Sequence, residues 1–209
     1  MPIEPFSLQG RHVRLEPLSL NHINALVAAS SGADPSLYAW SPIPQNPADA
    51  KRYIETALAW REAGTAVPFA TVRQSDGLVI GSTRFFDIEY WPWPAGQRFH
   101  GRTTPDVCEI GYTWLAPSAI RTAANTEAKL LMLTHAFEHW QVHRVCLHTD
   151  VRNQRSRDAI ARIGGKFEGI LRAHRMASDL TVRDSARFSI TAAEWPEAKQ
   201  RLEKMVGGR

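Results

Sequence analysis

Several kinds of feature are missing from this sequence. No run of about 18 consecutive apolar residues occurs, so we expect no membrane-spanning helix. The N-terminal segment MPIEPFSLQG has no basic stretch followed by an apolar one, unlike a secretory signal peptide. Only two cysteines occur, Cys108 and Cys146, and both lie in apolar segments without metal-site spacing. The sequence therefore predicts buried thiols, no membrane association and a reducing compartment, the cytoplasm.

A large excess of one charge is missing as well. The 25 Lys and Arg residues exceed the 21 Asp and Glu residues to give a formal net charge of +4. The cations are dispersed apart from clusters at Arg152–Arg157 and Arg172–Arg175. This favours a solvated surface and leaves attraction to an anionic ligand or to ribosomal RNA as the alternative. The eight histidines show no ligand spacing, so no metal site is expected.

Periodicity and turn residues predict a mixed α+β fold in one compact domain, residues 1–209. Strands are expected over residues 11–18, on both sides of the turn Ser75–Gly77, and over residues 107–115, 143–149, 166–173 and 181–190. Helices are expected over residues 19–30, 47–61, about 15 residues ending near Trp140, 152–164 and, with Thr191 as a cap, 191–206. Residues 91–105 are rich in proline and glycine and must form a loop. The order predicts a largely antiparallel sheet with a parallel pair near its middle.

The segment before the long apolar helix, AIRTAANTEA, has the position of a phosphate-binding turn but contains no glycine. Helix N-termini attract anions because their first N–H groups lack intrahelical partners and the helix dipole adds positive charge. Alanine is small enough for a close backbone approach, and an arginine adds a cation. Taken alone, the pattern is more typical of an ordinary capped helix. The candidate phosphate-binding residues are Arg121, Thr122, Ala123, Ala124, Asn125 and Thr126.

Support comes from the segment TDVRNQRSRDAIARIGGKFEGILR, in which a strand leads to Asn153 and Ser156 at the start of a helix that a Gly-Gly pair ends. With EIGYTWL, NTEAKLLMLTHAFE, VRDSARFSI and, near the start, RLEPL, the sequence resembles the GCN5-related N-acetyltransferase (GNAT) superfamily, in its ribosomal-protein N-acetyltransferase (RimJ/RimL-like) branch. The resemblance covers essentially the whole chain. It implies the GNAT fold, an α+β domain whose mixed, mostly antiparallel sheet is splayed in the middle and flanked by helices.

The resemblance also implies where acetyl-CoA binds. The pantetheine arm would lie in the gap between strands 107–115 and 143–149 and pair with the backbone of Trp114 and Leu115, while the pyrophosphate would lie on the candidate loop. Asn153 resembles the asparagine that contacts the cofactor, with an N-cap as its alternative role. Ser156 resembles a polar residue near the cofactor sulfur whose hydroxyl protonates the leaving thiolate. Its alternative role is that of an ordinary first-turn residue.

The sequence departs from the family pattern at two places. Ile120, Ala123 and Asn125 stand where the family has Gln or Arg, Gly, and Gly or Ala. Backbone donors supply most of the binding, so we still expect the loop to bind phosphate, aided by Arg121. A glutamate seen in some relatives after EGILR has no counterpart near His174–Arg175.

Acetyl transfer to an amine requires a base, because the amine arrives protonated. Glu109, in an apolar strand beside the expected gap, is the first candidate, acting through a water, and a buried structural carboxylate is its alternative role. His174 is the second candidate, because imidazole titrates near neutral pH. The resemblance places the loops that carry Trp40 and Trp91 beside the acceptor pocket, with packing onto the core as the alternative.

These features predict an N-acetyltransferase with acetyl-CoA as co-substrate and a primary amine as acceptor. A protein N-terminus, ribosomal proteins included, is the first acceptor that we expect. A small amine or an aminoglycoside is the second. A non-catalytic acyl-CoA- or ribosome-binding protein on the same fold is the rival function. The oligomeric state, a homodimer included, is left open.

Overall fold

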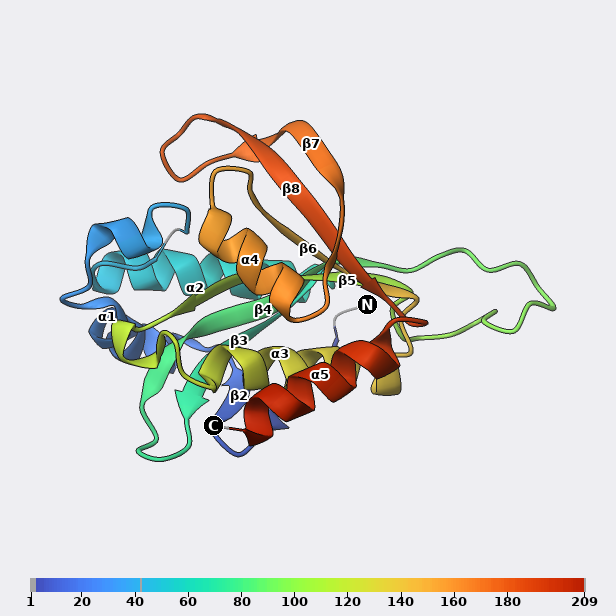
Figure 1. Cartoon of the computed structure of the whole chain (residues 1–209), viewed down its shortest axis with the longest axis horizontal. Coiled ribbons are helices and arrows are strands. Elements are labelled where there is room, and N and C mark those ends of the chain that lie inside the picture. Colours follow the sequence, from blue (N-terminus) through green and yellow to red (C-terminus); the bar gives the residue numbers. More distant parts are fainter. Residues whose placement is uncertain (1–2, 42, 209) are drawn as a thin grey trace.

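The computed structural model describes residues 3–41 and 43–208, and its centre is one eight-stranded sheet (Figure 1). The strands lie side by side in the order β1-β2-β3-β4-β5-β6-β8-β7. Neighbouring strands are antiparallel except β5 and β6, which are parallel, as the sequence predicts. The strands are β1 (Leu8–Gln9), β2 (Val13–Pro17), β3 (Ala66–Arg73), β4 (Val79–Glu89), β5 (Val107–Leu115), β6 (Arg144–Asp150), β7 (Lys166–Met176) and β8 (Val182–Thr191).

Helices cover the two faces of the sheet. On one face, α1 (Ile23–Ser30) contacts β4 and α2 (Pro47–Glu62) contacts β3. On the other face lie α3 (Ala124–Thr134), α4 (Gln154–Arg162) and α5 (Trp195–Gly207). Side chains of β4 alternate between the two layers: the Thr83 hydroxyl lies 3.7 Å from the Met132 sulfur of α3, whereas Ser82 accepts a hydrogen bond from Tyr53 of α2. None of the helices in the described part of the chain is long and apolar enough to cross a membrane.

The sheet opens between its two parallel strands. Pairing between β5 and β6 extends only from Val107↔Arg144 to Glu109↔Cys146. Beyond these residues β6 continues to pair with β8, while β5 continues to pair with β4, so the two halves of the sheet diverge (Figure 1). A register shift opposite Tyr112, whose φ is 52°, bends β5 at this point. The predicted splayed α+β sheet is confirmed.

In the structure, one helix cap and the type of one helical turn differ from the sequence prediction. Thr191 does not cap the terminal helix, because it is the last residue of β8, where it pairs with Arg144, and α5 begins at Trp195 after Glu194. A proline in the first turn of α5 favours this later start. The long apolar helix ends as an α-helix at Thr134 and continues as a π-helical turn, His135–His139. The Thr191 difference arises from strand pairing with β6, which the local sequence does not specify.

Glu127 fixes the first turn of α3 to the N-terminal part of the chain. Its buried carboxylate accepts hydrogen bonds from the backbone N–H groups of Arg11, His12 and Val13, at 2.8, 2.6 and 2.7 Å. A Cβ at Gly10 would lie 2.5 Å from the Glu127 carboxyl carbon, so the close approach requires glycine. The start of α3 is therefore held in place by the turn between β1 and β2.

Candidate active site

The glycine-free segment has a definite conformation that explains its composition. Arg121 carries the left-handed backbone conformation, with φ of 63°, while Ala123 has an ordinary φ of −70°. Thr122 closes the turn, since its hydroxyl donates to the Ala119 carbonyl at 2.7 Å and accepts from the Ala124 N–H at 3.2 Å. Ala123, which stands where the family has glycine, therefore needs no positive φ, and α3 begins at Ala124.

The next two side chains of this segment differ in their surroundings. Thr126 is buried, and its hydroxyl lies 3.5 Å from the Arg162 guanidinium of α4. The Asn125 amide oxygen is buried without a hydrogen-bond partner among the described residues. Thr126 therefore contributes to the joint between α3 and α4, and Asn125 presents an unsatisfied acceptor at the start of α3.

Trp114 and Leu115 end β5 at the open side of the gap. The Leu115 carbonyl accepts a hydrogen bond of 2.7 Å from the Tyr38 hydroxyl. On the other side, a Cβ at Gly81 would lie 2.1 Å from the Trp114 carbonyl oxygen, so β4 and β5 approach closely only because residue 81 is glycine. The backbone of β5 is therefore held from both sides where the two halves of the sheet separate.

Asn153 and Ser156 stand at the start of α4. Asn153 is the N-cap, because its side-chain oxygen accepts from the Ser156 N–H at 3.1 Å. The Ser156 hydroxyl forms no hydrogen bond with another described residue. The structure thus gives Asn153 the capping role, which leaves its amide NH₂ group available, and leaves the Ser156 hydroxyl available as well.

The connection between α1 and α2 joins the two sides of the gap. Tyr38 bonds to the end of β5, while the carbonyl of the preceding Leu37 accepts from Arg155 of α4. The Trp40 ring packs under the Arg152 guanidinium at 4.3 Å, a cation–π contact just before α4. Trp40 therefore lies at the open end of the gap, against the residues that precede α4.

A cavity of about 150 Å³ lies where β5 and β6 are still paired. It contains two of the predicted site residues, Glu109 and His174, whereas Ser156, Trp40 and Trp91 do not line it. Strand register brings its walls together. Glu109 pairs with Cys146, and His148, two residues further along β6, points to the same face of the sheet as Cys146. The lining residues are Asp87, Glu89, Val107, Cys108, Glu109, Cys146, His148, Leu171, His174 and Arg187.

Glu109 and His148 form a buried acid–base pair in this cavity. The Glu109 Oε2 atom bonds to the His148 Nδ1 atom, and the two side chains are 5% and 7% exposed. The His174 ring packs beside His148, with ring centroids 5.1 Å apart. Burial, followed by the neighbouring Arg175 cation, lowers the pKa of His174. Sequence reasoning does not identify His148, because only the parallel register between β5 and β6 places it against Glu109.

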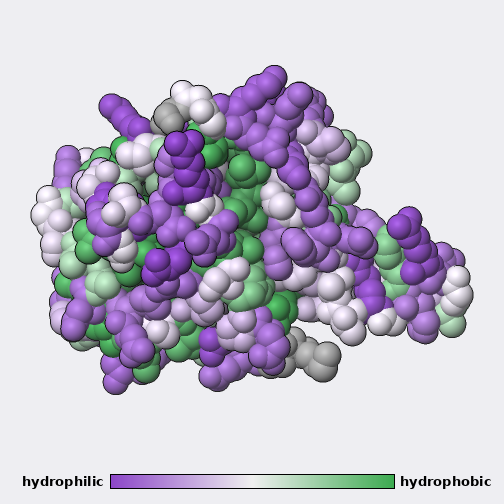
Figure 2. Space-filling view, turned by 90° about the horizontal axis from the view of Figure 1, so that it is seen from below, coloured by the Kyte–Doolittle hydropathy of each residue, from purple (hydrophilic) through white to green (hydrophobic). Residues whose placement is uncertain are grey.

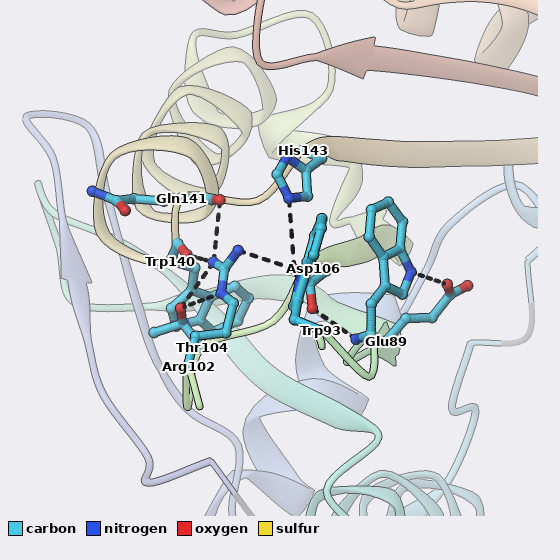
Figure 3. A network of polar contacts seen from close by, with 9 residues as sticks. Glu89, Trp93, Arg102, Thr104, Asp106, Trp140, Gln141 and His143 are labelled. Atoms are coloured by element: carbon cyan, nitrogen blue, oxygen red, sulfur yellow. Dashed lines mark hydrogen bonds and ion pairs between the residues drawn. The ribbon is translucent and has the colours of Figure 1, made fainter. Parts of the chain in front are cut away.

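Trp91 lies elsewhere, in the loop of residues 90–106 that extends from the sheet (Figure 1) as a largely hydrophilic projection (Figure 2). The ring is 42% exposed and stacks on His143 at 5.2 Å. The base of the loop is fixed by the buried Asp106 carboxylate, which accepts from the Trp91 N–H, the Trp93 indole and Arg102 at 2.7, 2.8 and 3.0 Å (Figure 3). The Trp91 backbone thus belongs to the base of the loop, while its side chain lies partly exposed outside the cavity.

Comparison with known proteins assigns the family. Residues 12–166 match the acetyltransferase (GNAT) domain family. The chain is 30% identical to a GCN5-related N-acetyltransferase from Brucella melitensis, covering 99% of this chain and 87% of that one with a TM-score of 0.82. A putative acetyltransferase from T. thermophilus is 33% identical over 99% of this chain and 100% of that one, with a TM-score of 0.77. The chain therefore belongs to the GNAT family of acetyltransferases, whose members use acetyl-CoA.

Relatives with a more specific description share the fold at lower identity. Mycobacterium smegmatis RimJ, in complex with CoA-disulfide, is 22% identical over 98% of this chain and 96% of that one, with a TM-score of 0.77. No protein of curated function matches the sequence. Family and fold thus define an acetyltransferase, and the acceptor has to be inferred from the site.

Proposed function

We propose that the protein is an acetyl-CoA-dependent N-acetyltransferase that acetylates a primary amine, and that residues 1–209 act as one domain. The observation that carries the proposal is the position of the cavity: it lies where the gap between β5 and β6 closes, and it contains the buried Glu109–His148 pair. A thioester that enters the gap from its open end would meet an amine at a buried acid–base pair. Such a meeting point is what acetyl transfer to an amine requires.

The start of α3 would bind the pyrophosphate of acetyl-CoA. Its first N–H groups lack intrahelical partners, and the exposed Arg121 would add a charge-assisted contact. The backbone of Trp114 and Leu115 would hold the pantetheine arm, and the Asn153 amide would contact the cofactor. The Ser156 hydroxyl would protonate the departing thiolate. The loop residues in this proposal are Arg121, Thr122, Ala123, Ala124, Asn125 and Thr126, of which Thr126 contributes its backbone, since its hydroxyl contacts Arg162.

The acceptor cavity has the charge that suits a cationic amine. Asp87, Glu89 and Glu109 all line it, so carboxylates outnumber the single arginine of the lining, Arg187. A protein N-terminus is the first acceptor that we propose, because solved structures of the same fold include RimJ and a putative ribosomal-protein-serine acetyltransferase from Vibrio cholerae. His174 would contact the amine from the cavity wall, and Trp40 and Trp91 would contact more distant parts of the acceptor.

A thiol-release assay with acetyl-CoA tests the proposal. Short peptides that begin with Ser or Ala, spermidine and kanamycin serve as acceptors, and a thermal-shift titration with acetyl-CoA reports cofactor binding. We expect a shift to higher melting temperature and thiol release with the peptides first. Release with spermidine or kanamycin alone would assign a small amine. A protein that acetyl-CoA does not stabilise and that releases no thiol would contradict the proposal, whereas stabilisation without release favours the non-catalytic acyl-CoA- or ribosome-binding alternative.

The proposal includes a cytoplasmic site of action and no membrane partner. Reduced thiols are consistent with that location: Cys108 and Cys146 are both buried and unpaired by disulfides. Burial raises the pKa of both thiols, which keeps them protonated and unreactive. Size-exclusion chromatography would determine whether the protein forms the homodimer that the sequence leaves open.

A further inference from the structure

His148 has one ring nitrogen in use and one without a partner. Its Nδ1 atom bonds to Glu109, whereas its Nε2 atom is buried and has no hydrogen-bond partner among the described residues. The side chain is 7% exposed and lines the acceptor cavity. Buried polar atoms in folded proteins are nearly always satisfied, and an exception in a cavity indicates a place where a ligand donates or accepts a hydrogen bond.

The contact with Glu109 sets the state of the other nitrogen. A carboxylate accepts a proton-bearing donor, so the neutral His148 ring carries its hydrogen on Nδ1 and leaves a lone pair on Nε2. The same carboxylate would stabilise the imidazolium once Nε2 has taken a proton. This is the arrangement of a base that a neighbouring carboxylate orients.

We propose that His148 is the general base that deprotonates the acceptor amine, and that Glu109 is its positioning residue. This inference rests on the proposed N-acetyltransferase function and changes the role of Glu109 within it. The Glu109 Oε2 atom is bonded to His148, so we assign the carboxylate to orienting the imidazole. The His174 Nδ1 atom is also buried without a hydrogen-bond partner among the described residues, but His148 is the imidazole that is bonded to a carboxylate, so we assign the amine proton to its lone pair.

The proton and electron balance of the step is complete without any further reactant. The ammonium N–H bond breaks and its proton goes to His148 Nε2. The nitrogen lone pair then forms a bond to the thioester carbonyl carbon, and the C–S bond breaks as the tetrahedral intermediate collapses. The thiolate receives the second nitrogen proton, by way of the Ser156 hydroxyl in the proposed function. The imidazolium returns its proton to water, so the products are the amide, CoA thiol and one proton.

The groups around His148 leave it able to take up this proton. Arg175 is paired with Asp87 at 2.6 Å, and Arg187 with Glu168 at 3.3 Å, so both cations are partly neutralised. His174 has a lowered pKa and stays neutral near pH 7, so it does not repel the imidazolium. The titratable and charged groups near the pair are Asp87 and Glu89 on β4, Cys108 and Tyr112 on β5, Cys146 on β6, His174 and Arg175 on β7, and Arg183 and Arg187 on β8.

Kinetics with the accepted peptide or amine separate the two roles. We expect His148→Gln to lower kcat by about 100-fold or more, within the range for loss of a general base, and to abolish the acidic limb of the pH profile of kcat/KM. Glu109→Gln should keep this limb and lower kcat by about tenfold, because the imidazolium loses the anion that stabilises it. The acetyl-CoA Kd should be unchanged in both variants. His139→Gln, at an exposed histidine after α3, is the matched control and should behave as wild type.

Two outcomes would overturn the inference. If Glu109→Gln abolishes the acidic limb while His148→Gln retains it, Glu109 is the base. If His148→Gln keeps normal turnover, the cavity does not use this imidazole at all. Either result leaves acetyl-CoA binding and thiol release by the wild-type protein intact, so it is distinguishable from failure of the proposed function, in which the wild-type protein neither binds acetyl-CoA nor releases thiol.

A measurement that requires no acceptor tests the inference about His148 independently. Two-dimensional NMR of ¹⁵N-labelled histidine rings reports the tautomer of each ring. We expect the neutral His148 ring to carry its hydrogen on Nδ1. His174→Gln should leave this tautomer unchanged. A neutral His148 ring with its hydrogen on Nε2 would overturn the inference even where no acceptor is known.

Discussion

Two buried carboxylates near the start of β5 have opposite surroundings. Asp106 is fully buried and surrounded by donors: the Trp91 N–H, the Trp93 indole and Arg102 all bond to it, with His143 at 3.6 Å (Figure 3). Glu109 is also buried, lines a cavity and has one side-chain partner, His148. A carboxylate whose acceptor sites are filled by donors is structural, whereas one that orients a single unsatisfied imidazole is available for chemistry.

The largest effect that this comparison predicts is on stability. Asp106→Asn would place NH₂ hydrogens against donors and leave Arg102 without its carboxylate. We expect the free energy of unfolding to fall by about 3 kcal/mol, since removing one partner of a buried charged pair leaves the other uncompensated. Urea unfolding measures this. Asp76→Asn, which disrupts an exposed pair with Arg73, should change stability little. An Asp106→Asn variant as stable as wild type would remove the distinction between the two carboxylates.

A third buried ionisable group, Lys129, should make the stability of the protein depend on pH. Its ammonium group donates to the Thr113 hydroxyl at 2.6 Å, and burial lowers the pKa of Lys129 to about 7. An unfolded lysine keeps its proton to about pH 10.4, so between these values the unfolded state binds more protons and stability rises with pH. Below pH 7 Lys129 is protonated in both the folded and the unfolded protein, so it no longer makes stability depend on pH.

Lys129→Met isolates this contribution. The variant should be more stable than wild type at pH 7, and its advantage should shrink by at most about 1.4 kcal/mol for each pH unit above 7. Urea unfolding of both proteins at pH 7, 8 and 9 gives the difference. A difference that does not vary with pH would show that the lysine is charged in the folded protein throughout this range.

At the start of α3 the relevant charge is exposed, and its effect should be on binding. Arg121→Ala should weaken acetyl-CoA binding by about 1–2 kcal/mol, the strength of a charge-assisted contact with the pyrophosphate. Ala124→Asp should weaken it further, because a carboxylate at the helix start repels the phosphates. Calorimetry that finds an unchanged Kd in both variants would exclude this segment from the cofactor site.

Unlike Asp106→Asn, Glu109→Gln should change stability little and should lower turnover. The glutamine side chain keeps a hydrogen-bonding oxygen for His148, so we expect the free energy of unfolding to change by less than about 1 kcal/mol. Turnover should fall by about tenfold, because the imidazolium loses its stabilising anion. Parallel urea and steady-state measurements on the two variants test the comparison directly. A Glu109→Gln variant that loses stability as Asp106→Asn does would assign both carboxylates to structure.

Local sequence patterns were sufficient for most of the fold. The strand over residues 107–115 was predicted at its observed bounds, since apolar residues fill it and Pro105 and Pro117 flank it. The Glu109–His148 pair could not be predicted, because it depends on which residue of β6 lies beside β5. That register is set by packing between segments more than 30 residues apart, and no local periodicity encodes it. The Thr191 cap failed for the same reason: pairing with β6 extended β8 through it.

Trp91 carries the smallest expected effect and determines whether the 90–106 loop does more than pack. Its backbone belongs to the Asp106 cluster, but its ring is partly exposed beside Glu89, whose carboxylate lines the acceptor cavity. If the ring contacts the acceptor, Trp91→Ala should raise the acceptor KM by about fivefold, equivalent to roughly 1 kcal/mol, with kcat unchanged. Trp93→Phe is the matched control, because it removes one hydrogen bond to Asp106 and should lower only stability, by about 1 kcal/mol. A Trp91→Ala variant with normal KM and reduced stability would assign a purely structural role to the 90–106 loop. Acceptor recognition would then belong to the cavity alone.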